Sequence, residues 1–183
     1  MKSFFNLLWT ILFFVQTSAQ TKNGQSLSVV PNVDLSRYIG TWYEIARLPN
    51  KYQKDCVGDV AATYSLLDDG EIKVVNQCRK ESGELTHVEG RARQASAEGP
   101  NSKLEVRFAP AFLSFLPFVW ADYWIIELAP DYSYAVIGGP SRKYLWILAR
   151  SPRMDEETLS AILARARQQG FESDAVIRTR HTQ

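Results

Sequence analysis

From Gly40 onward, the sequence alternates between short apolar runs and turn signals. Within 103–108, Leu104, Val106 and Phe108 alternate with charged residues, which places the apolar side chains on one face of a strand. The segment 68–70, Asp-Asp-Gly, is typical of a tight turn between antiparallel strands. The whole pattern predicts strands over residues 41–48, 60–67, 72–79, 85–94, 104–108, 122–128, 132–137 and 144–150. Eight strands with short connections favour a closed up-and-down barrel, because closure leaves no exposed sheet edge.

One helix is predicted after the last strand. Asp155 is its expected N-cap and Gly170 its expected end. Its apolar positions form one stripe at helical spacing, made of Leu159, Ile162, Leu163 and Ala166. A helix that follows a sheet normally covers it, and residues 176–177 predict a short final extended segment. The predicted fold is therefore all-β, an eight-stranded antiparallel up-and-down β-barrel with one C-terminal α-helix packed on its outside.

The first 19 residues have the features of a secretory signal peptide. Lys2 gives a basic start, residues 4–15 carry no charge, and Thr17 and Ala19 are the small residues that a signal peptidase requires. Because the apolar run is too short to cross a bilayer comfortably, cleavage is favoured over an uncleaved anchor. The predicted organisation is a signal peptide over 1–19, an N-terminal arm over 20–33 and one folded domain over 34–180.

Composition excludes several classes of function. The chain has 21 Lys and Arg against 20 Asp and Glu, so no surplus charge is available for phosphates and no nucleic-acid partner is expected. Aromatic residues make up 12%, which suits either a large core or a cavity for an apolar ligand. The two Cys and two His residues have no recognised zinc spacing, so no metal site is predicted. The sequence also has no phosphate loop and no nucleophile elbow, so we expect no cofactor and no catalytic residue.

Two segments, one in the first and one in the last predicted strand, are similar to those of a known family. Gly40-Thr41-Trp42-Tyr43 opens the first strand, and Tyr144-Leu145-Trp146-Ile147-Leu148-Ala149-Arg150 closes the last. Together they resemble the lipocalins, in particular the bacterial outer-membrane lipocalins, apolipoprotein D and the plant temperature-induced lipocalins. The resemblance runs from about Asn32 to Phe171. It implies that Gly40 and Trp42 lie at the closed floor of the barrel and that Arg150 stacks on Trp42.

The two cysteines, Cys56 and Cys78, can form one disulfide or remain free thiols. If Trp42 lies at the floor, the first strand runs upward, and both cysteines then lie at the open mouth. This common location, in an oxidising compartment, favours the disulfide.

Strand parity and the resemblance together predict the wall of a ligand cavity. The expected wall residues are Tyr64, Val106, Phe108, Trp124, Ile126, Tyr134 and Trp146. Core filling explains each of them equally well when it is taken singly, so the case for a cavity depends on the resemblance.

The predicted mouth loop 109–120 carries no charge, although loops are normally polar. Its aromatic residues include Phe112, Phe115, Phe118 and Trp120. One interpretation is a contact surface at the portal, for a lipid bilayer or for a second protomer in a homodimer. The alternative is a loop that folds inward and plugs the barrel.

The resemblance implies a non-enzymatic carrier of a hydrophobic small molecule, a fatty acid or a lysophospholipid, for lipid storage or transport in envelope maintenance. Export implies the periplasm, with peripheral contact at the outer membrane. No cysteine precedes Cys56, so a lipobox cysteine for acylation is absent from the sequence. Two other hypotheses stay open: a protein-interaction module that uses the mouth loop, and a lipocalin-type enzyme with its reactive group inside the barrel.

Overall fold

A computed structural model describes residues 26–182 of the chain. The predicted signal peptide, 1–19, and the start of the predicted arm lie outside these residues. Within 26–182, no helix has the length and apolar character needed to cross a membrane.

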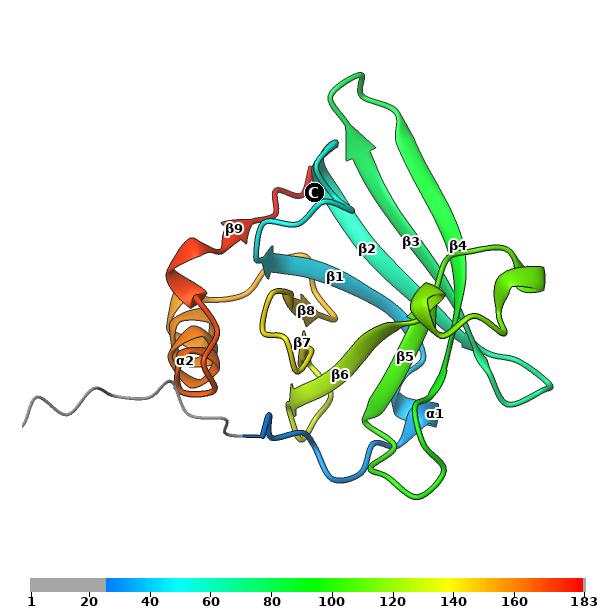
Figure 1. Cartoon of the computed structure of the whole chain (residues 1–183). Coiled ribbons are helices and arrows are strands. Elements are labelled where there is room, and N and C mark those ends of the chain that lie inside the picture. The colour runs from blue at the N-terminus through cyan, green and yellow to red at the C-terminus, as the bar shows by residue number, and fades with distance from the viewer. Residues whose placement is uncertain (1–25, 183) are drawn as a thin grey trace, which may run out of the picture.

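The strands follow the predicted segments closely, and they form an antiparallel barrel (Figure 1). Their bounds are β1 Gly40–Arg47, β2 Cys56–Leu66, β3 Ile72–Lys80, β4 Leu85–Gln94, β5 Lys103–Arg107, β6 Ala121–Leu128, β7 Tyr134–Gly138 and β8 Leu145–Ala149. Each strand pairs with the next in sequence, and β1 pairs with both β8 and β2. The predicted eight-stranded up-and-down barrel is therefore confirmed.

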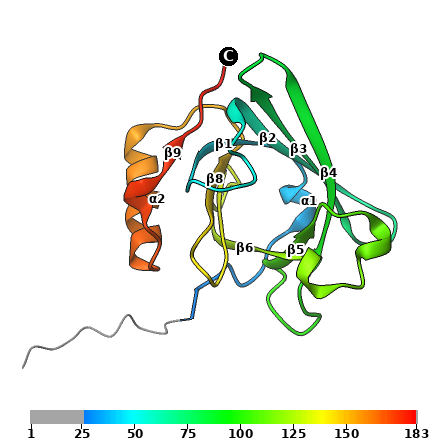
Figure 2. The same cartoon turned by 45° about the horizontal axis from the view of Figure 1, so that its top comes forward.

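The C-terminal helix α2, Glu156–Gln168, packs on the outside of the barrel, as predicted (Figure 2). Asp155 is its N-cap, and its side chain accepts a hydrogen bond of 2.7 Å from the backbone N–H of Thr158. Leu159, Ile162 and Ala166 are buried against outward-facing residues of β6, β7 and β8. This outer core is separate from a second cluster of buried side chains inside the barrel.

A short helix that the sequence did not reveal, α1 at Leu35–Tyr38, lies at the closed end of the barrel. The chain leading into it crosses the same end, where Val33 and Asn101 exchange two hydrogen bonds of 2.8 Å between the Val33 backbone and the Asn101 side chain. Val33 and Tyr38 are buried in the interior cluster. These residues close the floor.

The C-terminal segment completes the wall between β1 and β2. β1 pairs with β2 only from Gly40 to Tyr43, and beyond this point its free edge pairs with the short strand β9, Ile177–Arg178. The backbone N–H of Asp59 in β2 then donates to Arg180 O at 2.8 Å. We call residues 177–182 the C-terminal strap. It fills the gap that opens where β2 bends away from β1 (Figure 1).

Cys56 and Cys78 form a disulfide, which confirms the predicted pairing. The bond links the first residue of β2 to the upper part of β3 at the mouth of the barrel. It stabilises the fold chiefly by restricting the unfolded chain.

Candidate ligand-binding site

The interior wall is defined by rows of side chains that lie directly opposite one another on neighbouring strands. One row runs from Trp42 through Ala62 and Asn76 to Val88. Directly opposite residues share a face of the sheet, and Trp42 and Ala62 belong to the interior cluster, so Val88 also faces inward. Tyr64, Val106 and Trp146 pack in the same cluster, which places these three predicted wall residues inside the barrel.

The predicted inward orientation of Trp124, Ile126 and Tyr134 is wrong. All three pack in the outer core, against the helix. Their sequence neighbours Tyr123 and Ile125 are the ones that pack inside the barrel. Because both faces of β6 are covered, one by the interior and one by α2, both faces carry apolar residues and the alternation that would distinguish them is lost.

Solvent reaches the inward face of β4 and the end of β5. Val88 faces inward, yet 49% of it is exposed. Phe108 follows β5 and is 40% exposed, and its ring lies so close to Gly90 that a Cβ atom there would stand 2.6 Å from the ring. Gly90 shares the inward face of β4 with Val88. Phe108 is therefore at the rim of the interior, and glycine is required beneath it.

At the floor, Arg150 stacks on Trp42, as predicted. Its guanidinium carbon lies 3.8 Å from the centroid of the fully buried indole. The same guanidinium donates to the carbonyl oxygens of Arg37, Ile39 and Thr41 at 2.6–2.9 Å, which binds the end of α1 to the start of β1. Partial burial lowers the pKa of Arg150, although the group stays charged at neutral pH.

Three tyrosine hydroxyls meet just above the floor. Tyr123 Oη lies 2.9 Å from Tyr38 Oη and 2.8 Å from Tyr64 Oη. Burial raises the pKa of Tyr64 to about 12 and raises the pKa values of Tyr38 and Tyr123 well above 10, so all three hydroxyls are protonated. We call Tyr38, Tyr64 and Tyr123 the tyrosine cluster. It supplies neutral polar groups to an otherwise apolar lower interior.

A second polar group, which sequence reasoning missed, lies higher in the barrel. Glu44 and Arg47 of β1 are both buried and form an ion pair of 2.7 Å. Gln53 Nε2 donates to the second oxygen of Glu44 at 2.6 Å, and Gln53 Oε1 accepts from Trp146 Nε1 at 2.7 Å. The hydroxyl of Thr179 in the C-terminal strap also donates to Glu44. We call Glu44, Arg47, Gln53 and Thr179 the upper polar cluster.

A signal for this cluster was present in the sequence. Glu44 stands two residues after Trp42 in one strand, so period-two alternation places a charge on the inward face. Such a charge needs a buried partner.

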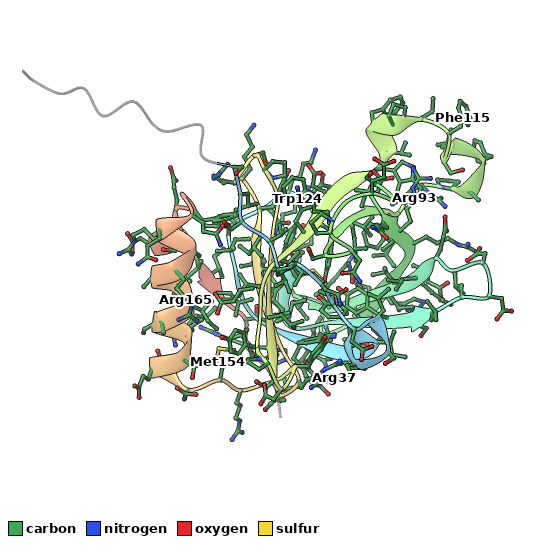
Figure 3. The ribbon with its side chains drawn as sticks, turned by 90° about the horizontal axis from the view of Figure 1, so that it is seen from below. Arg37, Arg93, Phe115, Trp124, Met154 and Arg165 are labelled. Atoms are coloured by element: carbon green, nitrogen blue, oxygen red, sulfur yellow. A yellow bond between two sulfur atoms is a disulfide. The ribbon has the colours of Figure 1, made fainter. Side chains whose placement is uncertain are left out.

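The mouth loop folds outward, and the alternative that it plugs the barrel is wrong. It contains two short 3-10 turns, η1 at Ala111–Leu113 and η2 at Pro117–Val119. Phe112, Phe115 and Phe118 are 74%, 77% and 79% exposed. Figure 3 shows Phe115 on a lobe that stands away from the barrel, on the side opposite the helix.

Trp120 fixes this lobe to the outer face of the barrel. The guanidinium carbons of Arg93 and Arg107 lie 3.9 and 5.1 Å from its ring centroid. Its Nε1 donates to Ser114 O at 2.8 Å, which ties the two turns together. Of the four predicted portal residues, Trp120 is therefore the anchor, and the three phenylalanines form the exposed tip.

Within the described part of the chain, no group of three His, Cys, Asp or Glu residues is arranged to hold a metal ion.

Comparison with known proteins defines the family. The model of the lipocalin-like domain matches residues 33–181, most of the chain. The chain is a lipocalin. Members of this family typically bind small hydrophobic ligands.

Relatives of this lipocalin come from plants, bacteria and animals. Temperature-induced lipocalin-1 of Arabidopsis thaliana is 39% identical over 85% of this chain and 83% of its own length. The outer membrane lipoprotein Blc of Escherichia coli K12 is 37% identical, with coverage of 89% and 88%. Rat apolipoprotein D is 37% identical, with coverage of 82% and 84%.

Among solved structures, insecticyanin from the tobacco hornworm superposes with a TM-score of 0.64. Its sequence is 20% identical, and the match covers 87% of this chain and 86% of insecticyanin. This likeness concerns the fold.

Proposed function

We propose that this lipocalin carries a fatty acid or a lysophospholipid in the barrel, outside the cytoplasm, for lipid storage or transport in envelope maintenance. The observation that carries the proposal concerns the upper interior, where solvent reaches the inward-facing Val88 and where Val106 and Trp146 supply apolar wall residues. An acyl chain that enters this space gains about 0.8 kcal/mol for each methylene removed from water. Burial of the chain alone therefore supplies the binding affinity that a carrier needs, without a catalytic group.

Two features support export. Residues 1–19 have the pattern of a secretory signal, and the single disulfide is typical of an oxidising compartment. We place the protein in the periplasm, in peripheral contact with the outer membrane. The outer membrane lipoprotein Blc, to which the chain is 37% identical, supports this location.

The exposed tip of the mouth loop supports direct contact with a bilayer. Phe112, Phe115 and Phe118 project together from a lobe at the mouth end, where a lipid must enter. The formal net charge is only +1, so attraction to anionic lipid is weak and insertion of the rings supplies the affinity. Transfer of a fluorescent fatty acid from vesicles to the protein measures this contact.

Native mass spectrometry of protein purified without detergent tests the carrier function. We expect a retained lipid, which denaturation releases for identification. Titration with a fluorescent fatty acid, such as cis-parinaric acid, then measures the affinity of the lipid-free protein. A protein that retains no lipid and binds no probe would contradict the proposal, and an empty dimer would favour the interaction module.

A matched pair of variants locates the binding site. Val88→Trp places an indole on the inward face of β4 in the upper interior, whereas His87→Trp places it on the outer face of the same strand, where His87 is exposed. We expect Val88→Trp to lower the affinity for the fatty acid and His87→Trp to leave it unchanged. Equal effects of the two variants would place the bound lipid elsewhere.

A further inference from the structure

The guanidinium of Arg47 faces the interior of the barrel. Arg47 lies directly opposite Trp146 in the β1–β8 ladder, and directly opposite residues share a face. Trp146 packs against the interior cluster, so the Arg47 side chain is directed inward as well. Only 7% of Arg47 is exposed. A cation therefore lies buried in the upper half of the proposed lipid site.

The hydrogen bonds of this ion pair are unevenly distributed. Glu44 is well satisfied, because its carboxylate accepts from Arg47, Gln53 and Thr179. Arg47 is not. Its Nη1 donates to Glu44 at 2.7 Å and approaches Thr179 Oγ1 at 3.4 Å, while Nη2 has only a long contact of 3.5 Å with Gln53 O. Its buried Nε finds no acceptor anywhere in residues 26–182.

The donors without good acceptors lie on one edge of the guanidinium. Nε–H and one Nη2–H of an arginine point in parallel and form a fork that fits two oxygens of a carboxylate or a phosphate. Glu44 binds the guanidinium only through Nη1, which leaves the fork with one long Nη2 contact and, among the residues that the structure describes, an unpartnered Nε. We propose that the Nε–Nη2 edge of Arg47 binds the anionic end of the carried lipid, a carboxylate or a phosphate, so that the acyl chain points toward the floor. This inference rests on the proposed carrier function.

The opposite orientation, with the anionic end at the floor, meets less suitable chemistry. The tyrosine cluster has three hydroxyl protons and two hydroxyl–hydroxyl contacts, so it has one donor to spare. This donor is neutral, and a buried anion is costly without a cation. The upper cluster lies nearer the mouth and includes Gln53 of the β1–β2 loop, which carries Lys51 and Lys54 beside Asp55. The floor also has a cation, Arg150, but its guanidinium stacks on Trp42 and already donates to three backbone carbonyl oxygens, whereas Arg47 Nε has no acceptor in the described part of the chain.

Three probes of similar shape separate the anchor from the cavity. They are cis-parinaric acid, its methyl ester, and diphenylhexatriene, which has no oxygen. We expect Arg47→Met to weaken binding of the acid about 10- to 100-fold, which is the loss of a hydrogen bond to a charged group. The affinity for the methyl ester should fall a few-fold, and the affinity for the hydrocarbon should not change. Competition by lysophosphatidic acid shows whether the same residue also recognises a phosphate.

Control variants separate anchoring from folding. Arg91→Met removes an arginine that is paired with Asp69 and Glu71, and it should change no affinity. Arg47→Met leaves Glu44 buried without its cation. If this variant does not fold, the double variant Glu44→Gln/Arg47→Met, which removes both charges, is used in its place. Tyr123→Phe tests the inverted orientation.

The outcomes are distinct for the anchor and for the carrier function. Selective loss of the acid, or of lysophosphatidic acid, in the Arg47 variant supports the anchor. Equal loss of all three probes, or selective loss of the acid in Tyr123→Phe instead, overturns it. If the hydrocarbon binds the wild type as tightly as the acid does and Arg47→Met changes neither, the anchor is wrong while the carrier function stands. Failure of the wild type to bind any probe contradicts the carrier function itself.

Discussion

Replacement of Phe115 and Phe118 by serine should slow the transfer of lipid from membranes to this lipocalin. Both rings are more than three-quarters exposed, so they contribute little to the fold and are available to a bilayer. Transfer of a phenylalanine side chain from water to an apolar environment is favourable by about 1.5–2 kcal/mol, the low end of the measured range. Loss of two rings should therefore cost about 3–4 kcal/mol of membrane affinity, or about 100- to 1,000-fold in partitioning.

The assay is stopped-flow transfer of a fluorescent fatty acid from neutral vesicles to lipid-free protein. If contact with the bilayer limits the rate, we expect the double variant to transfer at least about 10-fold more slowly, with little dependence on salt. Its melting temperature and its affinity for monomeric fatty acid should stay at the wild-type values, because exposed substitutions usually change stability by less than about 0.5 kcal/mol.

Leu66→Ser is the matched control. Leu66 is 58% exposed at the lower end of β2, away from the mouth, so its loss should leave transfer unchanged. Normal transfer by the Phe115→Ser/Phe118→Ser variant would refute the membrane contact. If that variant also converts a dimer into a monomer, the three phenylalanines are a protomer interface instead.

The remaining predictions concern stability. Substitution of Trp42 and Arg150 singly and together should give a coupling energy of about 1 kcal/mol in urea unfolding, and a coupling near zero would remove the stacking argument. Replacement of both Cys56 and Cys78 by alanine should destabilise the fold by up to about 3 kcal/mol, and two alkylatable thiols in protein purified without a reductant would contradict the disulfide. The backbone N–H of Thr182 and the guanidinium of Arg79 lower the pKa of Asp59 to about 2. Its ionised form therefore stabilises the fold above pH 4, and this contribution is lost as the pH falls toward 2, whereas Asp59→Asn should lack that acid-sensitive step in urea unfolding.

The strands and the outer helix could be predicted because their signals are local. Each strand is a short apolar or alternating run between turn residues, and α2 begins at an N-cap whose side chain bonds within the same turn. The disulfide was also within reach, because an up-and-down barrel puts the start of β2 and the end of β3 at the same end. The order of the strands alone therefore brings the two cysteines to the same end of the barrel.

The direction of side chains in β6 and β7 was not predictable in the same way. Ile125 faces the interior and Ile126 faces α2, yet the two residues are chemically identical. Where helix and interior cover both faces of a sheet, the polar half of the alternation disappears, and register is decided by tertiary packing. A bulge between Ile125 and Glu127 shifts the ladder further.

For the mouth loop and the C-terminal strap, too, the local sequence left open a choice that contacts between distant residues decide. The apolar composition of 109–120 is equally suited to a plug and to an exposed tip, and the contacts of Trp120 with Arg93 and Arg107 decide for the outside. The pattern of residues indicates which segments are strands and which loop is unusual, and the resemblance to the lipocalins implies which end of the barrel is the floor. The position of the strap beside β1 and the inward direction of Arg47 could not be predicted, because both depend on contacts between residues more than 90 positions apart in the chain.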